Sequence, residues 1–452
     1  MNWRKPVMNL GFKLLGYDVF KNYHQLIRLE YAPKAKLDEL QRELLGKLLR
    51  HAEVNVPYYK EILNDCGVIK GNDVKFENFD KIPVLTKDII RQQGEKLHSV
   101  DKESRSWHSN SSGGSTGEPV VFVQDKDYHS WGWACRLYYN QMAGKLPGQR
   151  ELKLWGSERD ILHESEKLVT KLRRWGFNIK FLNSFNMTDE IMAHYVNKWN
   201  EFKPETVSAY TSSIYEFSRY IESSESDIYS PGSITCTAET LTEDTRSFIE
   251  DIFKCPVLNQ YGSREVGVVA CECKEKEGLH LFPLNNIVEI LNNELKPCRA
   301  GEVGNIYVTT LHNYSMPFIR YNIGDMAVSS EKKCSCGRSF SVIEKVVGRS
   351  VEVFKTRDGK VVPSQFFIHF VGVVYNKGYI EKFQVIQEDY DRIVIKVIIK
   401  NKGKFKQHSP QVINSIKEVM GQGCEVKFEI VDKIPPSKSG KYQYTICRIP
   451  VN

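Results

Sequence analysis

The chain has 452 residues, which is too long for a single hydrophobic core and predicts two or three domains. Hydrophobic residues make up 41% of it and aromatic residues 11%, as in soluble globular proteins, and no apolar run is long enough to span a bilayer. The net charge is +7, and the basic start from Met1 to Lys5 lacks the apolar stretch of a signal peptide, so we expect a cytoplasmic protein without an integral membrane segment.

The first clear element is an amphipathic helix from Leu37 to Ala52, where apolar residues recur at helical spacing with charges between them. The sequence Asn55-Val56-Pro57-Tyr58-Tyr59 ends it. We expect this helix to belong to a helical N-terminal segment of about residues 1–100.

A loop of small residues follows, with three glycines and four hydroxyl side chains in the run Ser111-Ser112-Gly113-Gly114-Ser115-Thr116-Gly117-Glu118-Pro119. Backbone N–H groups of such a loop can point together and form a nest for phosphate. The apolar run Val120–Val123 after it predicts a strand. A flexible linker is the alternative, and a Walker-type phosphate loop is excluded because no lysine follows the last glycine.

The middle of the chain alternates short apolar strands with helical stretches, which predicts an α/β fold with helices covering sheets. The predicted elements are strand Leu152–Trp155, helix Glu164–Arg174, strand Ile179–Leu182 and strand Glu302–Leu311. Before them lies an aromatic helix that includes Trp131 and Tyr138. These side chains are candidates for an acyl pocket or for stacking on a sugar, and core packing is the alternative that we favour for most of them.

Two clusters combine glycine with charged residues. In Tyr261-Gly262-Ser263-Arg264-Glu265-Val266-Gly267 a charged pair lies in a glycine-bounded turn, and the Glu265 carboxylate is suited to Mg²⁺. An Arg264–Glu265 surface pair is the alternative. In the run Pro317–Asp325, Asp325 follows a turn glycine and can accept hydrogen bonds from a ribose diol, unless it forms an ordinary Asx turn.

The character of the chain changes near Gly348, after which short strands and one helix predict a small α+β domain of about a hundred residues. The predicted elements are strands Lys382–Ile386, Arg392–Ile399 and Glu425–Val431 and helix Gln411–Met420. A loop near the end, Pro435-Pro436-Ser437-Lys438-Ser439-Gly440-Lys441, carries lysines suited to reaching a phosphate from another domain. A tail lysine without a role is the alternative.

This C-terminal region holds the excess positive charge, with 18 Lys and Arg against 10 Asp and Glu from Gly348 onward. A basic region can meet nucleic acid, a membrane or a polyphosphate ligand. No interleaving of basic and aromatic residues indicates a nucleic-acid platform, and the run Lys400–Lys406 is typical of a solvated face. We therefore predict no nucleic-acid partner.

Taken in order, the motifs SSGGSTGEP, YGSREVG, RYNIGD, a Gly-Arg pair and PPSKSGK resemble the adenylate-forming superfamily of acyl- and aryl-CoA ligases, peptide-synthetase adenylation domains and luciferases. Within it the chain is similar to the phenylacetate–CoA ligase family and to its CapK-like branch, associated with capsular polysaccharide synthesis. The segment Leu48–Leu63 also resembles that branch. The resemblance covers nearly the whole chain. It implies a large α/β domain with mixed sheets and covering helices over residues 1–347, and a small mobile α+β domain over residues 348–452.

The resemblance also implies roles for individual residues. The loop Ser111–Gly117 would hold the β- and γ-phosphates of ATP, and Glu265 would ligate Mg²⁺. Asp325 would bind the ribose hydroxyls, with Arg349 on the ribose or a phosphate. Lys441 would contact the α-phosphate and the substrate carboxylate during adenylation.

Further residues fall where related enzymes build the adenine and acid pockets. Tyr261 would lie against adenine, next to Gly262 and Ser263. The implied pocket residues are Ala238 and Glu239 for the nucleotide, and Tyr210 and Ser212 for the acid. Two positions depart from the family pattern: Ser350-Val351-Glu352 follows the Gly-Arg pair where two acidic residues are frequent, and Glu118 replaces a frequent basic residue after the glycine loop.

The 11 cysteines predict thiols or metal ligands rather than disulfides in a large cytosolic protein. Two Cys-x-Cys pairs with a histidine between them favour a closed tetrahedral Zn²⁺ site. The expected ligands, similar to a zinc site suggested by the phenylacetate–CoA ligase branch, are Cys273, His280, Cys334 and Cys336. Cys271 is the alternate ligand, and buried thiols without metal are the alternative interpretation. Four protein ligands leave no open position, so the zinc would be structural.

We therefore expect an ATP-dependent ligase that forms an acyl-AMP and pyrophosphate from a small carboxylic acid. The acyl group would then pass to CoA, or to an amine or sugar acceptor in polysaccharide synthesis. The alternatives are a catalytically silent scaffold protein with the same fold and a zinc-containing nucleic-acid-binding protein. Retention of Glu265, Asp325 and Lys441 argues against a silent scaffold.

Overall fold

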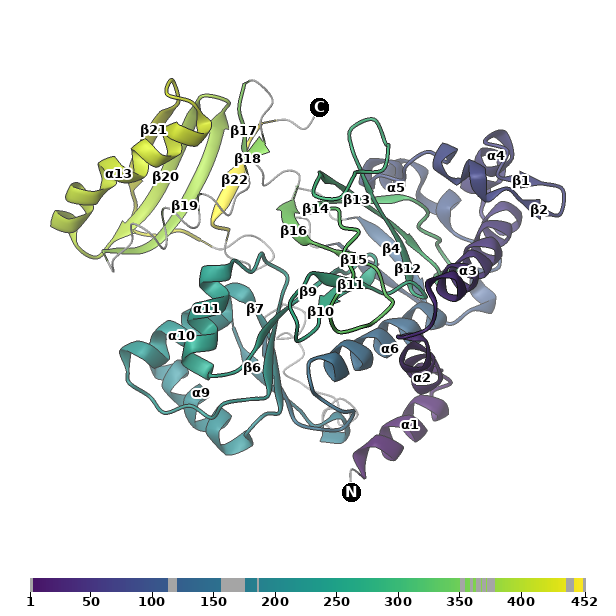
Figure 1. Cartoon of the computed structure of the whole chain (residues 1–452), viewed down its shortest axis with the longest axis horizontal. Helices are drawn as coiled ribbons and strands as arrows, with labels where there is room; N and C mark the ends of the chain where they lie inside the picture. The colour runs from purple at the N-terminus through teal and green to yellow at the C-terminus, as the bar shows by residue number, and fades with distance from the viewer. Residues whose placement is uncertain are drawn as a thin grey trace.

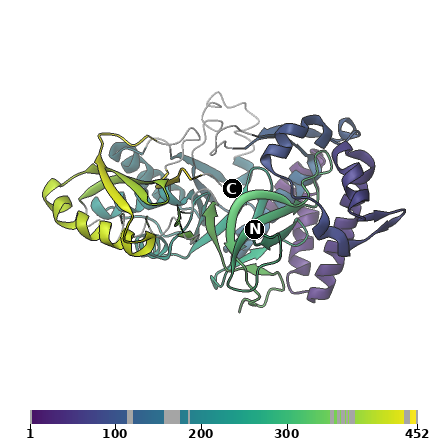
Figure 2. The ribbon, with the colours of Figure 1, turned by 90° about the horizontal axis from the view of Figure 1, so that it is seen from above.

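A computed structural model shows a large N-terminal part, built from helices and two sheets, and a smaller C-terminal part (Figure 1). From above, the C-terminal part and the N-terminal helices lie at opposite ends of the molecule, with the sheets between them (Figure 2). The structure describes residues 3–112, 120–155, 175–184, 187–349, 354–357, 361–362, 367, 371, 379–435 and 443–449. The predicted α/β fold class is confirmed.

The N-terminal segment is helical, as predicted. Its helices are α1 (Arg4–Leu14), α2 (Val19–Leu29), α3 (Lys34–Asn55), α4 (Pro57–Asp65) and α5 (Lys87–Gln93). Two short strands, β1 (Ile69–Lys70) and β2 (Asp73–Val74), and three 3₁₀ turns at Phe76–Lys81, Gly94–Leu97 and Lys102–Ser104 complete it. Pro57 occupies the first turn of α4, where its missing N–H costs nothing, so the chain stops α3 and starts a new helix there.

The main sheet has eight strands in the order β15-β11-β10-β9-β8-β7-β5-β6. Its strands are β5 (Glu151–Trp155), β6 (Ile179–Asn183), β7 (Thr206–Tyr210), β8 (Ser233–Thr237), β9 (Val257–Ser263), β10 (Gly267–Glu272), β11 (Leu279–Leu281) and β15 (Val342–Ile343). The strands from β6 to β9 are parallel, and those from β9 to β15 are antiparallel. Helices α9 (Asp189–Phe202), α10 (Thr211–Ser223) and α11 (Glu243–Phe253) pack on the parallel half. The predicted strands at 152–155 and 179–182 are confirmed, and the predicted helix Glu164–Arg174 lies outside the described residues.

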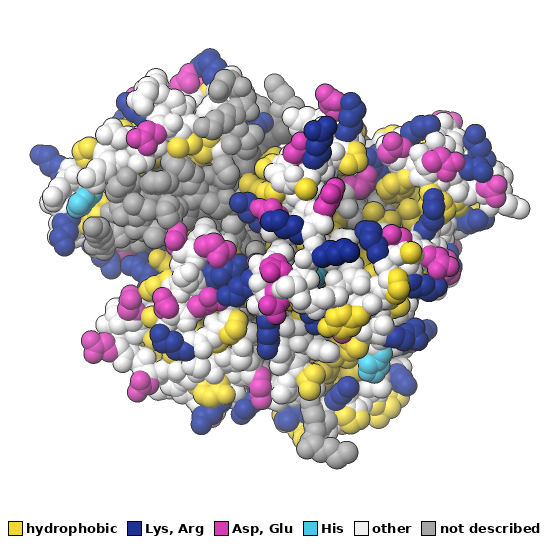
Figure 3. Space-filling model, viewed as in Figure 1, with side chains coloured by type: hydrophobic (Ala, Val, Ile, Leu, Met, Phe, Trp, Pro, Cys, Tyr) yellow, Lys and Arg dark blue, Asp and Glu magenta, His cyan; other side chains and the backbone are white. Residues whose placement is uncertain are grey.

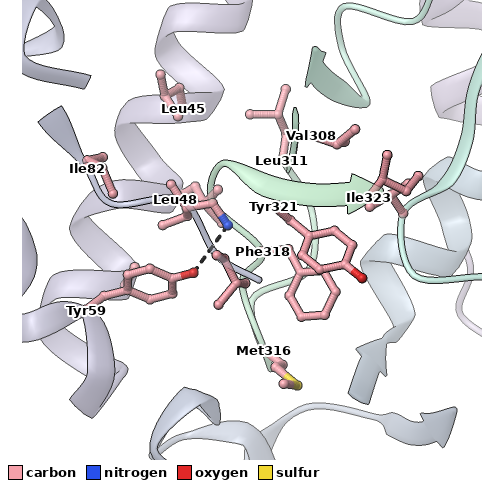
Figure 4. Close-up of a cluster of buried hydrophobic side chains, with 14 of the residues drawn as sticks. Leu45, Leu48, Tyr59, Ile82, Val308, Leu311, Met316, Phe318, Tyr321 and Ile323 are labelled. Atoms are coloured by element: carbon pink, nitrogen blue, oxygen red, sulfur yellow. Dashed lines mark hydrogen bonds between the residues drawn. The ribbon is translucent and has the colours of Figure 1, made fainter. Parts of the chain in front are cut away.

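A second sheet has the order β12-β13-β14-β16, with strands β12 (Asn286–Leu291), β13 (Val303–Thr310), β14 (Tyr321–Val328) and β16 (Lys345–Arg349). Beside it lies the hairpin of β3 (Trp107–Ser111) and β4 (Val121–Asp125), which leads into α6 (Lys126–Met142). One core joins these elements to α3 and α4, and Leu48, Tyr59 and Phe318 are almost fully buried in it (Figure 4). The Tyr59 hydroxyl accepts a hydrogen bond of 3.3 Å from the Ile319 backbone N–H, which fixes α4 to the sheet.

The C-terminal part has its own core and a four-stranded sheet of order β21-β20-β19-β22. Its elements are β17 (Phe354–Lys355), β18 (Val361–Val362), β19 (Ile380–Asp389), β20 (Arg392–Ile399), α13 (Lys402–Met420), β21 (Glu425–Ile430) and β22 (Thr445–Cys447). The predicted strands are confirmed. The helix begins about nine residues before the predicted Gln411, because Asn401 caps it and Phe405 is buried against the sheet.

The expected boundary at residues 347 and 348 falls at the end of strand β16. Strand β16 continues to Arg349 and pairs with β14, so Gly348 and Arg349 lie in the N-terminal sheet. The backbone of Gly348 has a φ of +112°, a conformation that favours glycine.

Candidate functional site

The carboxyl ends of five parallel strands of the main sheet lie on one side, where open α/β sheets bind ligands. Tyr210 ends β7, and its ring lies 4.3 Å from that of Trp155, which ends β5. Thr237 ends β8 and is paired with Gln260 on β9. The structure therefore brings the predicted acid-pocket residue Tyr210 to the same edge as the predicted nucleotide residues. Trp155 was missed, because an aromatic residue at a strand end is equally typical of a core.

Glu239, just beyond β8, is hydrogen-bonded to the start of α10. Its carboxylate accepts hydrogen bonds from the Ser212 backbone N–H at 2.7 Å and from the Ser212 hydroxyl at 3.0 Å. A carboxylate at a helix N-terminus is favoured by the exposed N–H groups there. Ala238 precedes it with a φ of +70°, which is rare for a residue other than glycine. The predicted residues Ser212 and Glu239 are thus one unit, with the Ser212 hydroxyl held by Glu239.

The turn that joins β9 to β10 positions Glu265. Gly262 faces the other arm of the hairpin so closely that a Cβ would collide with the Gly267 carbonyl oxygen, and Gly267 has a φ of +69°. The buried Gln124 donates to the carbonyl oxygen of Arg264 at 2.8 Å, and the Tyr128 hydroxyl donates to that of Glu265 at 3.4 Å.

The backbone N–H of Glu265 also donates a hydrogen bond of 3.2 Å to the Ser263 hydroxyl. The backbone of this turn is therefore held on several sides, and the Glu265 carboxylate forms no ion pair among the described residues. A buried carboxylate on a turn held in this way can offer the oxygen ligand that Mg²⁺ prefers. Gln124, which supports the turn, carried no signal in the sequence, because a glutamine in an alternating strand is not unusual.

Tyr261 and Asp325 meet although they are 64 positions apart. The Tyr261 hydroxyl donates a hydrogen bond of 2.7 Å to Asp325 Oδ2, joining the main sheet to the second sheet. The expected turn at Gly324 is wrong, since Gly324 and Asp325 lie inside strand β14. The strand accommodates them by a shift of register against β13, and Gly324 has a φ of +84°. Asp325 is paired with Arg349 in the backbone register of β14 and β16.

The glycine-rich segment is the loop of the β3–β4 hairpin. Ser111 ends β3, and Ser112 and Val120 close the loop through two hydrogen bonds of 2.9 Å. The strand predicted after the loop is confirmed as β4. The predicted phosphate-binding residues Gly113, Gly114, Ser115, Thr116 and Gly117 lie outside the described residues. So do Lys438 and Lys441, and the side chain of Arg349.

The four residues predicted to bind zinc come together. The ligand atoms of Cys273, His280, Cys334 and Cys336 all lie within 4.8 Å of one another. Cys273 follows β10, His280 lies on β11, and the two later cysteines lie in the loop before β15. Cys271 is excluded from the cluster, because its sulfur lies against Met142 Sδ at 4.0 Å on α6.

The surroundings of this cluster suit a metal that takes sulfur and nitrogen ligands. Burial lowers the pKa of His280 to about 4, so the imidazole is neutral at pH 7 and able to bind a metal. Burial alone would raise the pKa of Cys336, but hydrogen bonds from the backbone and side chain of Arg338 lower it below its ordinary value. Arg338 is itself held by Glu30 at 2.7 Å, which ties the end of α2 to the cysteine loop. The donor set and its burial fit Zn²⁺.

Two candidate substrate residues on α6 are instead part of the core. Tyr138 is 1% exposed, and its hydroxyl donates to Glu30 at 2.8 Å. Trp131 is 8% exposed and is stacked on His312, with ring centroids 4.3 Å apart. Both side chains are used in packing, so the structure favours the core alternative and we do not propose them as substrate contacts.

The chain is similar to several known proteins. A family model for the CapK C-terminal domain matches residues 354–448. Protein CapK of Staphylococcus aureus is 26% identical over 417 residues, which cover 91% of this chain and 90% of its own length. Phenylacetate-coenzyme A ligase of Thermus thermophilus is 23% identical over 439 residues, 91% of this chain and 97% of its own. The chain is therefore similar to CapK and to phenylacetate-coenzyme A ligases over most of its length.

A solved structure shows the same fold. 2-Hydroxyisobutyryl-CoA ligase in a postadenylation state matches the CapK-like chain with a TM-score of 0.74 and 16% identity, over 92% of this chain and 91% of its own. The same ligase in its thioesterification state matches with a TM-score of only 0.59 over a similar length.

The buried side chain of His312 is expected to lower the free energy of unfolding in acid. Burial lowers its pKa to about 4, and its Nε2 lies 2.6 Å from the Leu284 carbonyl oxygen. Because the unfolded chain takes up this proton near pH 6.5 and the folded chain does so only near pH 4, stability is full above pH 6.5 and falls as the pH drops between these values. Between pH 7 and pH 5 the loss from this residue is about 2 kcal/mol. Urea unfolding of the wild type and of His312→Gln at both pH values checks this, and an equal pH dependence of the two proteins would contradict it.

Proposed function

We propose that this CapK-like chain is an AMP-forming ligase that activates a carboxylic acid with ATP and then transfers the acyl group to a nucleophile. The observation that carries the proposal is the contact between Tyr261 and Asp325, next to the held turn of Glu265 and at the carboxyl edge of the parallel sheet. The likeness to phenylacetate-coenzyme A ligases supports the reaction class.

In this proposal different residues bind different parts of the nucleotide. Asp325 would accept hydrogen bonds from the ribose hydroxyls. Tyr261, whose hydroxyl donates a hydrogen bond to Asp325, would lie against the adenine. Glu265 would hold Mg²⁺, which neutralises phosphate charge when it is bound. The hairpin loop after Ser112 would bind the phosphates. The enzyme then supplies position and charge rather than a covalent intermediate of its own.

The acid would enter beside Tyr210, whose ring lies 4.3 Å from that of Trp155, at a tilt of 37°, at the neighbouring strand end. CoA is the first candidate acceptor, because several of the similar proteins are named as CoA ligases. An amine or a sugar hydroxyl of capsular polysaccharide synthesis is the alternative, suggested by the resemblance to CapK. The cysteine cluster would hold a structural Zn²⁺ away from this chemistry.

A pyrophosphate-exchange screen over aryl acids, fatty acids, amino acids and uronic acids tests the proposal. We expect one class of acid to support exchange of labelled pyrophosphate into ATP, and the acceptor is then identified by adding CoA, amines or sugars to the enzyme loaded with that acid. Absence of exchange with every acid, together with absence of ATP binding, would favour the silent scaffold over the ligase.

Glu265→Gln and Asp325→Ala should both weaken adenylation, but for different reasons. The first variant loses an anionic metal ligand, so its rate should recover in part at high Mg²⁺ concentration. The second leaves the ribose hydroxyls unpaired, at a cost of about 1–3 kcal/mol, which Mg²⁺ cannot restore. ATP titrations of exchange at two Mg²⁺ concentrations separate these effects. Arg264→Gln is the matched control in the same turn, and unchanged kinetics in both test variants would refute the site.

A further inference from the structure

Helix α1 presents a row of apolar side chains to solvent. Trp3 just before the helix, Val7, Leu10 and Leu14 recur at intervals of four, three and four residues, which places them on one helical face. Their exposed fractions are 46%, 47%, 58% and 78%. Figure 3 shows hydrophobic side chains at the lower right, over the N-terminal helices, where Figure 1 places α1. We call these four residues the α1 stripe. A contiguous row of this kind usually marks an interaction site, whereas single exposed apolar residues do not.

The α1 stripe is not the face with which α1 packs on the protein. That face carries Met8 and Phe12, which are 5% and 8% exposed. The Phe12 ring lies against Trp133 and Phe177, with ring centroids 5.7 and 5.4 Å apart. These contacts fix the roll of the helix about its axis. The stripe therefore points outward and cannot be buried by a simple rotation of α1.

The charged residues of α1 are all of one sign. Between Trp3 and Tyr17 the charged residues are Arg4, Lys5 and Lys13, and no acidic residue occurs. The first acidic residue, Asp18, lies 3.6 Å from Lys21 and is thereby compensated. A helix with an apolar row and a basic flank complements an apolar layer covered by negative charge.

Two exposed tryptophans at the start of α1 also suit an apolar layer covered by negative charge. The Trp3 ring lies 5.4 Å from the Trp175 ring, which is 59% exposed. The Arg4 guanidinium lies over both rings, at 4.6 and 5.8 Å from their centroids. Tryptophan and arginine together suit the boundary between water and lipid, because the ring prefers the interface and the cation meets the head groups.

We propose that the α1 stripe binds the surface of an anionic lipid bilayer, with α1 lying in the plane of the interface. This goes beyond the proposed ligase activity, since α1 holds none of the residues assigned to the nucleotide or the acid. No helix among the described residues is long and apolar enough to cross a membrane, so the contact is at the surface. It would hold the enzyme at the membrane.

Vesicle binding by the full chain tests the proposal. We expect co-sedimentation with vesicles of phosphatidylglycerol and phosphatidylcholine in equal parts, and much weaker binding to phosphatidylcholine alone. Leu10→Ser combined with Leu14→Ser should weaken binding at least about tenfold, because each leucine then loses its transfer from water. Lys13→Gln should weaken it about fivefold, and only at low salt, as expected for one cation at an anionic surface.

Ile430→Ser is the matched control, because Ile430 is 62% exposed on β21 of the C-terminal sheet, and it should bind vesicles like the wild type. Circular dichroism and pyrophosphate exchange of the double variant, both unchanged, show that it is folded. Equal binding by the double variant and the wild type, or equal binding to neutral and anionic vesicles, overturns the proposal. So does a dimer in sedimentation velocity that the double variant dissociates without any vesicle binding, since the stripe is then an interface between copies of the chain.

Discussion

Replacing Lys441 by alanine is expected to slow acyl-adenylate formation by about 10²–10³, while transfer from preformed acyl-AMP continues. In the first half-reaction the incoming carboxylate and the α-phosphate are both negative, so a lysine between them reduces their repulsion where charge builds up. In the second half-reaction the acyl phosphate bond already exists, and the lysine is no longer needed. Pyrophosphate release and acyl transfer, measured separately on the same preparation, test both halves.

The structure gives this prediction a context, although Lys441 itself lies outside the described residues. The chain around it is anchored on both sides, by the buried Ile434 before it and by β22, paired with β19, after it. Lys438→Ala is the matched control, because Lys438 lies on the same loop and carries the same charge. If Lys438 rather than Lys441 proves essential, the motif alignment at the C-terminus is wrong. If both half-reactions fall together in Lys441→Ala, the expectation that a mobile C-terminal domain removes Lys441 from the site before acyl transfer is wrong.

The elements that could be predicted from the sequence are those with a strong local signal. The apolar runs of β5, β6, β13, β19 and β20 and the helical spacing of α3 each specify one type of element, whatever the rest of the chain does. The segment around Gly324 shows the limit of local reasoning. A glycine followed by an aspartate is typical of a turn, but pairing with β13 and β16 keeps both residues in a strand. The positive φ of the glycine is accommodated there by a shift of register between β14 and β13.

The candidate site was predictable where the residue types are chemically distinctive. Two Cys-x-Cys pairs with a histidine between them predicted the ligand set, and the side chains of Cys273, His280, Cys334 and Cys336 do converge. The contact of Tyr261 with Asp325 depends on how two sheets meet, so residue chemistry alone did not predict it. Aromatic residues carry the least information, because the same pattern suits a core and a pocket. Only their burial distinguishes Tyr138, which is in the core, from Tyr210, which lies at the strand edge.

Removing the metal that the cysteine cluster is proposed to hold should destabilise the large part of the protein. The cluster lies in a core shared by α1, α2 and α6, where Cys273 and Cys334 are 2% and 5% exposed. Without a metal ion, three cysteine sulfurs within 4.8 Å of one another would have the Arg338 guanidinium beside Cys336 to balance them, which is one charge for three sulfurs. Purified protein should contain about one equivalent of zinc, and Cys334→Ser should lower this content and reduce the free energy of unfolding by about 4 kcal/mol or more.

The control for this experiment is Cys271→Ser, because Cys271 is as buried as Cys273 but its sulfur lies against Met142 instead of the cluster. This variant can lose stability through the buried hydroxyl, but its zinc content should stay near one equivalent. Metal analysis and urea unfolding of both variants therefore separate loss of the ion from loss of packing. The pyrophosphate-exchange activity of Cys334→Ser, where protein remains folded, should fall only in proportion to the folded fraction, since the cluster has no open position for substrate. Metal-free protein that unfolds at the same urea concentration as the zinc-loaded protein would contradict the structural role.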